Sequence, residues 1–199
     1  MKDMEVKKYK VLALFGKSGA GKDTIQNWLV SNYPTKLNKI VSYTTRPKRD
    51  YEVEGEAYHY INIKEFTDRL LSFDFIEAAV FNNWGYGTSI QSLKSDKINI
   101  GVFNPEGIRT LISDPRIDIL PIYIDCKDKT RLLRILSREE EVDCNELCRR
   151  FFADEKDFSN LDFGYLIYEN ENENKKTWED LLTFNFDLFT WIEELVEID

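Results

Sequence analysis

The stretch of sequence that decides the fold is residues 9–24, YKVLALFGKSGAGKDT. Its first seven residues form a short apolar run, typical of a buried parallel strand, and residues 24–30 have helical character. Between them, GKSGAGK matches the pattern G-x-x-x-x-G-K. Glycines in such a loop let backbone N–H groups turn inward toward a phosphate, and the dipole of the next helix adds partial positive charge. The pattern predicts a phosphate-binding loop, with an ordinary glycine-rich turn as the alternative.

This loop predicts a site for ATP. The backbone would cradle the β-phosphate, and Lys22 would reach the β- and γ-phosphate oxygens. The residues expected to bind ATP are Gly16, Ser18, Gly19, Ala20, Gly21, Lys22, Asp23 and Thr24.

Asp23 departs from the usual pattern, in which a Ser or Thr follows the lysine and binds Mg²⁺ through its hydroxyl. Here Asp23 follows Lys22, and Thr24 comes next. A carboxylate so close to ATP would repel it unless it faced a cation, so Asp23 is predicted to bind Mg²⁺ directly or through water. The alternative is that Asp23 points to solvent and stabilises the helix N-terminus, while Thr24 or water completes the metal shell.

Apolar runs alternate with helical segments along the rest of the chain. We expect strands near residues 39–41, 75–81, 98–103, 119–126 and 163–168, and helices near residues 64–71, 105–112, 129–137, 145–156 and 177–196. This alternation is typical of an α/β domain with an open, mainly parallel sheet. A length of 199 residues without a recognisable linker predicts one domain over residues 1–199.

Composition and charge narrow the classes of function. Hydrophobic residues make up 42% of the chain, which is typical of a folded globular protein. The net charge of −9 disfavours a nucleic-acid partner, because such a surface would repel phosphates overall. No stretch is long and apolar enough to predict a membrane span or a leader peptide. With three cysteines, read as reduced thiols, the expectation is a cytoplasmic protein without a membrane partner; the oligomeric state is not predicted.

A local basic cluster lies in residues 42–58, SYTTRPKRDYEVEGEAY. Arg46 and Arg49 could clamp a phosphate, because a planar guanidinium offers paired donors to phosphate oxygens. Tyr58 could add a hydroxyl donor. Taken in isolation, the cluster is better interpreted as a solvated basic loop.

The cluster is not isolated, because this segment resembles the guanylate kinase family. The family pattern S-x-T-T-R-x-x-R followed by E-x-x-G-x-x-Y is matched at Ser42, Thr44, Thr45, Arg46, Arg49, Glu52, Gly55 and Tyr58. A second family block is matched by FIE at residues 75–77 and by NWGYGT at residues 83–88. The matches extend from the phosphate loop to the last expected strand, so the resemblance covers most of the chain.

The resemblance implies a P-loop kinase fold with an inserted nucleotide-monophosphate-binding region at about residues 42–89. In that family arrangement, Arg46, Arg49, Tyr58 and Tyr86 would bind the phosphate of the acceptor nucleotide. Ser42, Glu77 and Thr88 would read the guanine. Glu77 suits this role chemically, because a carboxylate can accept hydrogen bonds from both N1–H and the exocyclic amine of guanine, and adenine cannot present that pair of donors.

Two family features are altered. Val102 and Asn104 replace two strand aspartates of the family. Val102 cannot help to bind a metal, whereas Asn104 can still accept a hydrogen bond through its carbonyl and is retained as a substrate-binding residue.

The family also has a helical lid, which would lie at about residues 138–150 here. Arg138 and Arg150 are the expected lid arginines that act with Lys22 and Arg46 in catalysis, and Arg134 and Arg149 are the alternatives. These arginines could instead form weak surface pairs with neighbouring glutamates.

The implied function is the Mg²⁺-dependent phosphorylation of GMP or dGMP by ATP. One rival is a non-enzymatic guanylate-kinase-like module that binds phosphorylated protein, but it predicts a degraded phosphate loop, and residues 16–22 are intact. The other rival is a related kinase for another phosphorylated small molecule, such as a sugar phosphate. The changes at Val102 and Asn104 leave room for it, whereas Glu77 and Tyr58 argue against it.

Overall fold

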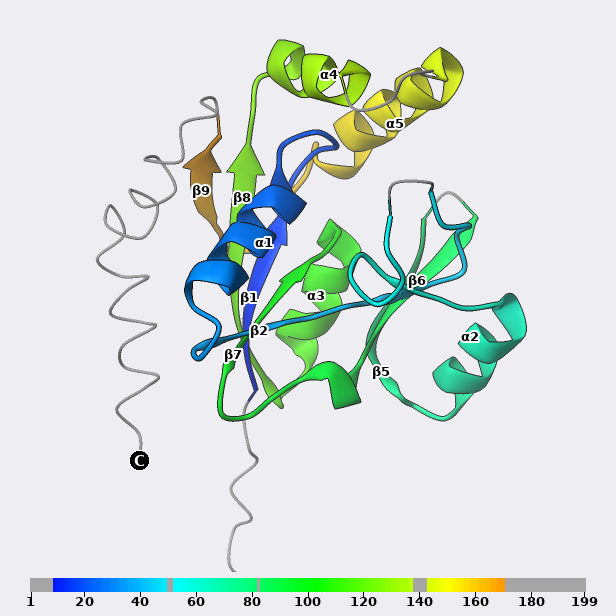
Figure 1. Cartoon of the computed structure of the whole chain (residues 1–199), viewed down its shortest axis with the longest axis vertical. Helices are drawn as coiled ribbons and strands as arrows, with labels where there is room; N and C mark the ends of the chain where they lie inside the picture. The colour runs from blue at the N-terminus through cyan, green and yellow to red at the C-terminus, as the bar shows by residue number, and fades with distance from the viewer. Residues whose placement is uncertain (1–8, 50–51, 82, 138–142, 171–199) are drawn as a thin grey trace, which may run out of the picture.

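A five-stranded parallel sheet forms the centre of the molecule (Figure 1). The computed structural model describes residues 9–49, 52–81, 83–137 and 143–170. The strand order is β2-β7-β1-β8-β9, with the bounds β1 Tyr9–Phe15, β2 Leu37–Lys39, β7 Ile98–Val102, β8 Ile117–Asp125 and β9 Leu166–Glu169. Every neighbouring pair in this sheet is parallel, which confirms the predicted fold class.

The central strand β1 is buried on both faces. Side chains alternate across a strand, so Leu12 and Leu14 pack on the face covered by α1 (Lys22–Asn32), whereas Val11 and Phe15 pack on the face covered by α3 (Pro105–Ser113). A parallel strand covered on both sides needs a continuous apolar run, which is what the sequence of β1 supplies.

Parallel pairing brings the carboxyl ends of the central strands to one edge of the sheet. Leu14 of β1 lies opposite Val102 of β7, and Phe15 lies opposite Tyr123 of β8. The phosphate loop leaves β1 at this edge, next to the residues that follow β7. Open α/β sheets bind ligands at this edge.

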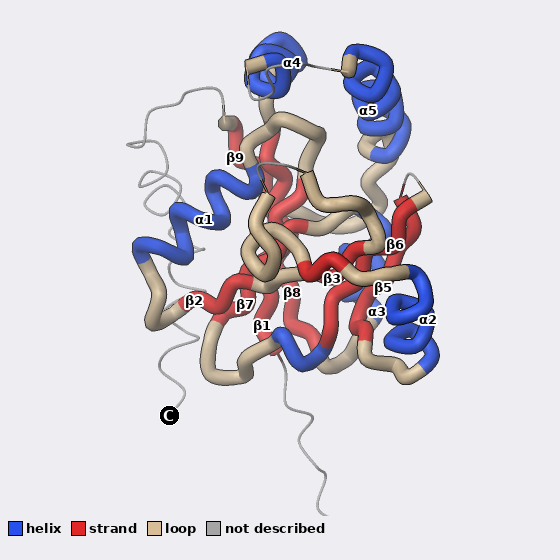
Figure 2. Tube along the Cα trace, turned by 45° about the vertical axis from the view of Figure 1, so that its right-hand side comes forward, coloured by secondary structure: helices blue, strands red, loops and turns tan. Residues whose placement is uncertain are grey.

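A second, four-stranded sheet lies beside the first, within the expected nucleotide-monophosphate-binding region (Figure 2). Its order is β4-β3-β6-β5, with the bounds β3 Tyr43–Thr44, β4 His59–Tyr60, β5 Phe75–Phe81 and β6 Trp84–Ser89. Helix α2 (Ile63–Leu71) joins β4 to β5, and a short 3₁₀ turn, Ile90–Ser92, follows β6. The sequence patterns predicted only β5 of these strands.

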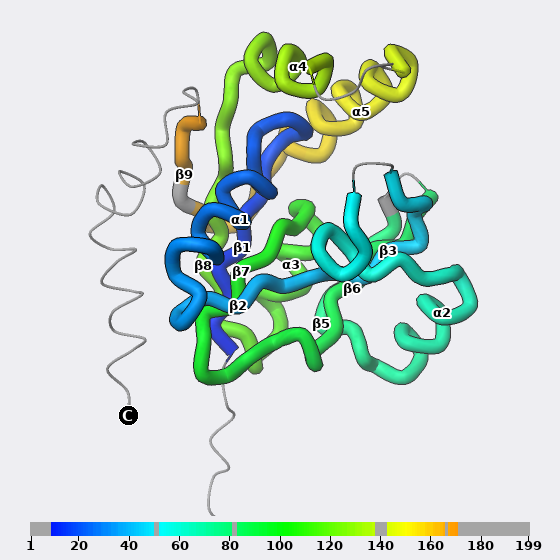
Figure 3. The backbone as a smooth tube through the Cα atoms, viewed as in Figure 1, coloured from blue at the N-terminus to red at the C-terminus, as the bar shows by residue number. Residues whose placement is uncertain are grey.

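Helices α4 (Asp128–Leu136) and α5 (Cys144–Asp157) lie together at the end of the molecule that holds the phosphate loop (Figure 3). The helix expected at residues 177–196 lies outside the described residues. Among the helices that the structure describes, none has the length and apolar character to cross a membrane.

Candidate functional site

A large open cleft runs from the phosphate loop to the second sheet and is bordered by α5. Its volume is about 1430 Å³, above the ~300–1,000 Å³ that is common for small-molecule sites, which leaves room for two nucleotide-sized ligands. It is lined by most of the expected residues: Gly16, Ser18, Gly19, Lys22, Asp23, Thr24, Ser42, Arg46, Arg49, Tyr58, Glu77, Tyr86, Asn104, Arg149 and Arg150. The two halves of the predicted site therefore face one space.

The phosphate loop has the backbone shape that its glycines allow. Gly19 and Gly21 have φ values of +80° and +97°, in the left-handed region that other residues rarely adopt. A Cβ atom on Gly19 would also come within 2.5 Å of the carbonyl oxygen of Arg131. Lys22 folds back into the loop, where its Nζ donates to the carbonyls of Gly16 (2.7 Å) and Lys17 (3.0 Å).

The beginning of α1 supplies hydrogen-bond donors for a phosphate. The first N–H groups of a helix have no intrahelical acceptor, and Gly21, at the N-cap, offers no side chain to satisfy them. Asp23 and Thr24, in this first turn, are exposed and line the cleft. This end of α1 is therefore suited to binding an anion.

Two of the residues predicted to bind ATP already make hydrogen bonds to other parts of the protein. Both donors of Ser18, its backbone N–H and its hydroxyl, face the carboxylate of Asp154 at 2.8 and 3.2 Å. Ala20 is buried, and its carbonyl accepts hydrogen bonds from Asn170 Nδ2 (2.7 Å) and from Arg134 (3.4 Å). Asp154, Asn170 and Arg134 therefore hold the shape of the phosphate loop. Gly21 also lies outside the cleft lining.

At the acceptor end of the cleft, Arg46 is held by Glu52. The guanidinium makes two hydrogen bonds to this carboxylate, at 2.7 and 3.0 Å, and lies over the rings of Tyr58 and Tyr60. Burial by itself would lower the pKa of Arg46, but the hydrogen bond and charge of Glu52 outweigh burial and raise this pKa. Arg46 is therefore a fixed, fully charged donor aimed into the cleft.

Glu52 organises this end of the site, and the sequence analysis did not assign it a role. It also accepts hydrogen bonds from the hydroxyl of Tyr60 (2.7 Å) and from the backbone N–H of Arg49 (2.8 Å). The side chain of Arg49 lies 3.9 Å from the same carboxylate. The signal that could have identified Glu52 is its place in the family pattern, three residues after Arg49.

Tyr58 and Tyr86 lie edge to face, with their ring centroids 5.8 Å apart, and both line the cleft beside Arg46. Burial, together with the charge of Asp23, raises the pKa of Tyr58, so its hydroxyl stays protonated at neutral pH. A protonated phenol can donate to a phosphate oxygen.

Glu77 on β5 lies at the inner end of the cleft, only 6% exposed. Its Oε1 accepts a hydrogen bond of 2.6 Å from Thr88 Oγ1, which is 2.9 Å from Ser42 Oγ. Thr88 is fully buried behind Glu77 and does not line the cleft. Among the described residues, Oε2 has no hydrogen-bond partner, so it remains available to a ligand.

Asn104 begins α3, and its side-chain oxygen accepts from the N–H of Gly107 at 2.7 Å. From the sequence, we expected this carbonyl to accept a hydrogen bond from the guanine base. Because the oxygen already caps the helix, the amide N–H₂ is the part of Asn104 more readily available to a ligand.

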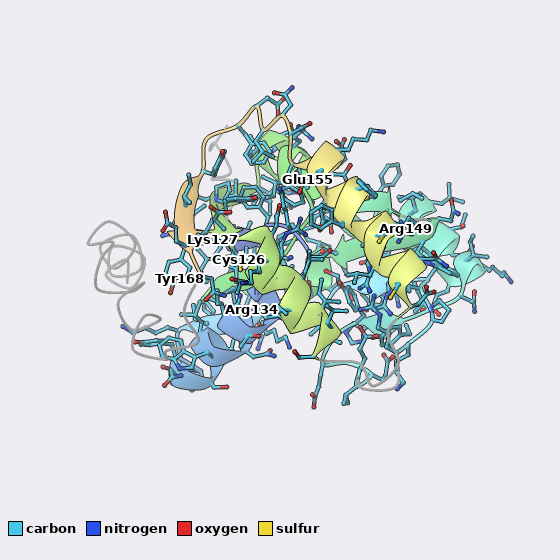
Figure 4. The ribbon with its side chains drawn as sticks, turned by 90° about the horizontal axis from the view of Figure 1, so that it is seen from above. Cys126, Lys127, Arg134, Arg149, Glu155 and Tyr168 are labelled. Carbon is cyan, nitrogen blue, oxygen red and sulfur yellow. The ribbon has the colours of Figure 1, made fainter. Side chains whose placement is uncertain are left out.

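The structure describes three of the four candidate lid arginines, and they lie in different places relative to the cleft. Arg150 lines the cleft, and its Nε is buried without a hydrogen-bond partner among the described residues. Arg149 also borders the cleft, but it is more exposed and makes two 2.7 Å hydrogen bonds to Glu146. Arg134, labelled in Figure 4, lies on α4 and contacts the phosphate loop from outside the cleft. Arg138 lies outside the described residues.

The residues present fit a Mg²⁺ ion that is bound mainly through ATP. Mg²⁺ in such sites takes one or two protein oxygens together with phosphate and water, so no cluster of carboxylates is required. Asp23 and Thr24 offer these oxygens, whereas Val102 lines the cleft without offering any. No group of three or more acidic, cysteine or histidine side chains suited to a metal is found among the described residues.

Burial raises the pKa of Glu77 to about 7, although the Thr88 hydroxyl acts in the opposite direction. Its native pKa thus lies above the unfolded value of 4.5, and between these values the folded protein binds more protons than the unfolded one. We expect the free energy of unfolding to fall as the pH rises from about 4.5 to 7, by on the order of 2–3 kcal/mol from this group. Urea denaturation across this range should show the slope in the wild type, with Glu77→Gln removing it and the exposed control Glu106→Gln retaining it. Parallel pH profiles for all three proteins would contradict the assignment.

The comparisons with known proteins agree with this geometry. The chain is similar to Disks large homolog 1 of Danio rerio (47% identical) and Disks large homolog 2 of Homo sapiens (44%), each over 77 residues, which are 38% of this chain and 9% of the relative. It therefore spans about a tenth of the length of these relatives. In fold, it resembles guanylate kinase from Anaplasma phagocytophilum, with a TM-score of 0.64, 21% identity and coverage of 89% of this chain and 85% of that one. The sequence profile of the Guanylate kinase family matches residues 8–184, so the chain belongs to the guanylate kinase family.

Proposed function

We propose that this protein transfers the γ-phosphoryl group of ATP to GMP or dGMP. The observation that carries the proposal is the single cleft, in which the phosphate loop with Lys22 faces the acceptor groups Arg46, Tyr58 and Tyr86. A binding module for one ligand would need only one of these two halves. Because the chain consumes ATP in this proposal and Cys126, Cys144 and Cys148 form no disulfide, we place it in the cytoplasm.

Phosphoryl transfer needs no nucleophile from the protein, because an oxygen of the acceptor phosphate attacks the γ-phosphorus of ATP. The bond from the γ-phosphorus to the bridging oxygen breaks, and ADP leaves. The protein's role is to position the two nucleotides and to offset negative charge. Lys22 would exchange the carbonyls of Gly16 and Lys17 for the phosphate oxygens of ATP.

On the acceptor side, Arg46 and Arg49 would hold the nucleotide phosphate in line with ATP. Glu52 fixes both residues before the ligand arrives, so less conformational freedom is lost on binding. Arg150, which lines the cleft with its Nε 3.6 Å from Glu146 Oε1, would stabilise the transferring group. Mg²⁺, held by Asp23 and Thr24 together with ATP, would reduce the charge on the β- and γ-phosphates.

The end of the cleft that holds Glu77 and Asn104 supports a guanine-containing acceptor. Oε2 of Glu77 is available, Oε1 is fixed by Thr88, and an ionised carboxylate can accept from two adjacent guanine donors. The amide of Asn104 would donate to an acceptor atom on the same base. Because free Glu77 titrates near neutrality, guanine binding would draw it into the ionised form.

A second candidate is a module that binds a phosphorylated protein in the acceptor half without using ATP. It is favoured by the carboxylate of Asp23, which lines the cleft and adds negative charge beside the ATP site. A kinase for another phosphorylated small molecule is a third possibility, given Val102 and Asn104. The assays below separate these three functions.

Lys22→Ala should lower the rate of phosphoryl transfer by about a hundredfold or more, because it removes the charge nearest the transferred group. The fold should survive, since the Lys22 ammonium donates to the carbonyls of Gly16 and Lys17 in its own loop, which water could solvate in the variant. Turnover and thermal melting should be measured beside Lys64→Ala, an exposed lysine on α2. Near-normal turnover in folded Lys22→Ala would refute the kinase proposal.

An ADP-release assay across acceptors tests the substrate. GMP and dGMP should react at least tenfold faster than AMP, CMP and UMP, because the other bases would leave the buried Glu77 carboxylate unpaired, at a cost of ~1–3 kcal/mol. Glu77→Gln should lose this preference, and Glu106→Gln should keep it. Equal rates with AMP, or reaction only with a sugar phosphate, would exclude the guanine assignment. Binding of a phosphopeptide without ADP release would favour the second candidate.

Replacing Asp23 with Ala should raise the Mg²⁺ concentration needed for half-maximal rate by about tenfold if Asp23 faces the cation. Initial rates titrated with Mg²⁺ at fixed ATP should be compared with those of Asp68→Ala, which removes an exposed carboxylate from α2. An unchanged Mg²⁺ requirement would leave Asp23 as a residue that stabilises the start of α1 through the helix dipole.

A further inference from the structure

The tip of the phosphate loop is bonded to a carboxylate from a distant part of the chain. Asp154 of α5 accepts from the backbone N–H of Ser18 at 2.8 Å and from its hydroxyl at 3.2 Å. Asp154 is only 5% exposed. A buried carboxylate is costly unless its charge is compensated and its oxygens accept hydrogen bonds.

Arg131 of α4 supplies this compensation. It is completely buried, and its guanidinium donates to Asp154 (3.2 Å), to Asp128 (2.8 Å) and to Glu155 (3.0 Å). Glu155 also binds Lys17 of the phosphate loop at 2.6 Å. Figure 4 shows α4 and α5 side by side, with Glu155 labelled on α5. One buried cation therefore connects both helices to the loop.

The backbone of α4 contacts the loop as well. The close approach of the Arg131 carbonyl to Gly19 leaves no room for a Cβ atom at that position. The loop tip, residues 17–19, is thus held between Arg131 on one side and Asp154 on the other.

The peptide unit between Lys17 and Ser18 explains why this contact bears on ATP. In a trans peptide, the C=O and N–H groups point in opposite directions. The carbonyl of Lys17 accepts from Lys22 Nζ at 3.0 Å, and the N–H of Ser18 donates to Asp154. Asp154 and Lys22 therefore fix the orientation of one peptide plane from its two ends.

We propose that Asp154, held by Arg131, is a positioning residue that keeps the phosphate loop in its ATP-binding shape. This inference rests on the proposed ATP site. With the 17–18 peptide anchored from outside, the loop keeps its turn, and Lys22 keeps its hydrogen bonds to the carbonyls of Gly16 and Lys17. Without Asp154, this peptide can rotate, which would move the Lys17 carbonyl away from Lys22 Nζ and change the shape of the loop.

Isothermal titration calorimetry with ATP and, separately, with GMP tests the role. Asp154→Ala should raise the Kd for ATP at least tenfold and leave the Kd for GMP within twofold of the wild type, because the acceptor groups do not contact Asp154. Asp128→Ala is the matched control: it removes another carboxylate from Arg131 but does not touch the loop, so both Kd values should stay within twofold. Asp154→Asn, whose amide oxygen can still accept from Ser18, should recover part of the ATP affinity.

A second variant guards against misfolding, since Asp154→Ala leaves Arg131 buried without its main partner. Arg131→Met combined with Asp154→Leu removes both charges and should show the same selective loss of ATP. Unchanged or tighter ATP binding in a folded variant would overturn the inference, and so would an equal loss of ATP and GMP. If the wild type itself binds no ATP, the proposed function and this inference both fail; if it does and Asp154→Ala binds equally well, only this inference fails.

Discussion

The burial of β1 between two helical layers is the constraint on which the site depends. Its side chains are covered by α1 on one face and by α3 on the other, so the strand cannot slide or twist without opening a core. The chain must then leave the carboxyl end of β1 at a fixed point and reverse at once into α1. The glycines at positions 19 and 21 allow this reversal, and Lys22 fills its concave side. The phosphate cradle follows directly from this packing.

The central sheet and the phosphate loop were predictable because their signals are local. Strand, loop and first helical turn all fall within residues 9–24, and β1, β7 and β8 are mostly apolar runs. Strand β2, LNK, is not apolar, and the sequence placed it at residues 39–41 instead of Leu37–Lys39. The second sheet gave no comparable signal: β3 and β4 are two residues long each, and β6 contains two glycines. What stabilises these strands is pairing between distant segments, such as Tyr43 with Gly87. The hydrophobic periodicity of a single segment gives no sign of such pairing.

The contacts that orient the site were harder to foresee than the residues that would touch ligand. Arg46, Tyr58 and Glu77 belong to recognisable patterns, and the structure brings them to one cleft. Arg131, by contrast, occupies an ordinary position in a polar helix, where an arginine is usually solvated. Its burial results from packing of α5 against α4, and the partner carboxylate lies 23 residues away. Helical spacing within α4 therefore predicts Asp128 as a partner but not Asp154.

In the proposed function, an acidic chain binds two polyanions and must control every carboxylate near the phosphates. Glu52 is neutralised by Arg46, Asp154 by Arg131, and Glu146 by Arg149, so these acids orient cations without adding much free negative charge. Burial raises the pKa of Glu77 to about 7, so its carboxyl is only partly ionised at neutral pH until a ligand supplies donors. Asp23 differs from them, because it makes no ion pair with any described residue although it lines the cleft. A carboxylate left uncompensated there would repel ATP by roughly 4 kcal/mol per unit charge at ~4 Å and an effective dielectric constant of ~20. In the proposed function, the cation that arrives with ATP would remove this repulsion, and the altered loop sequence would then be compatible with nucleotide binding.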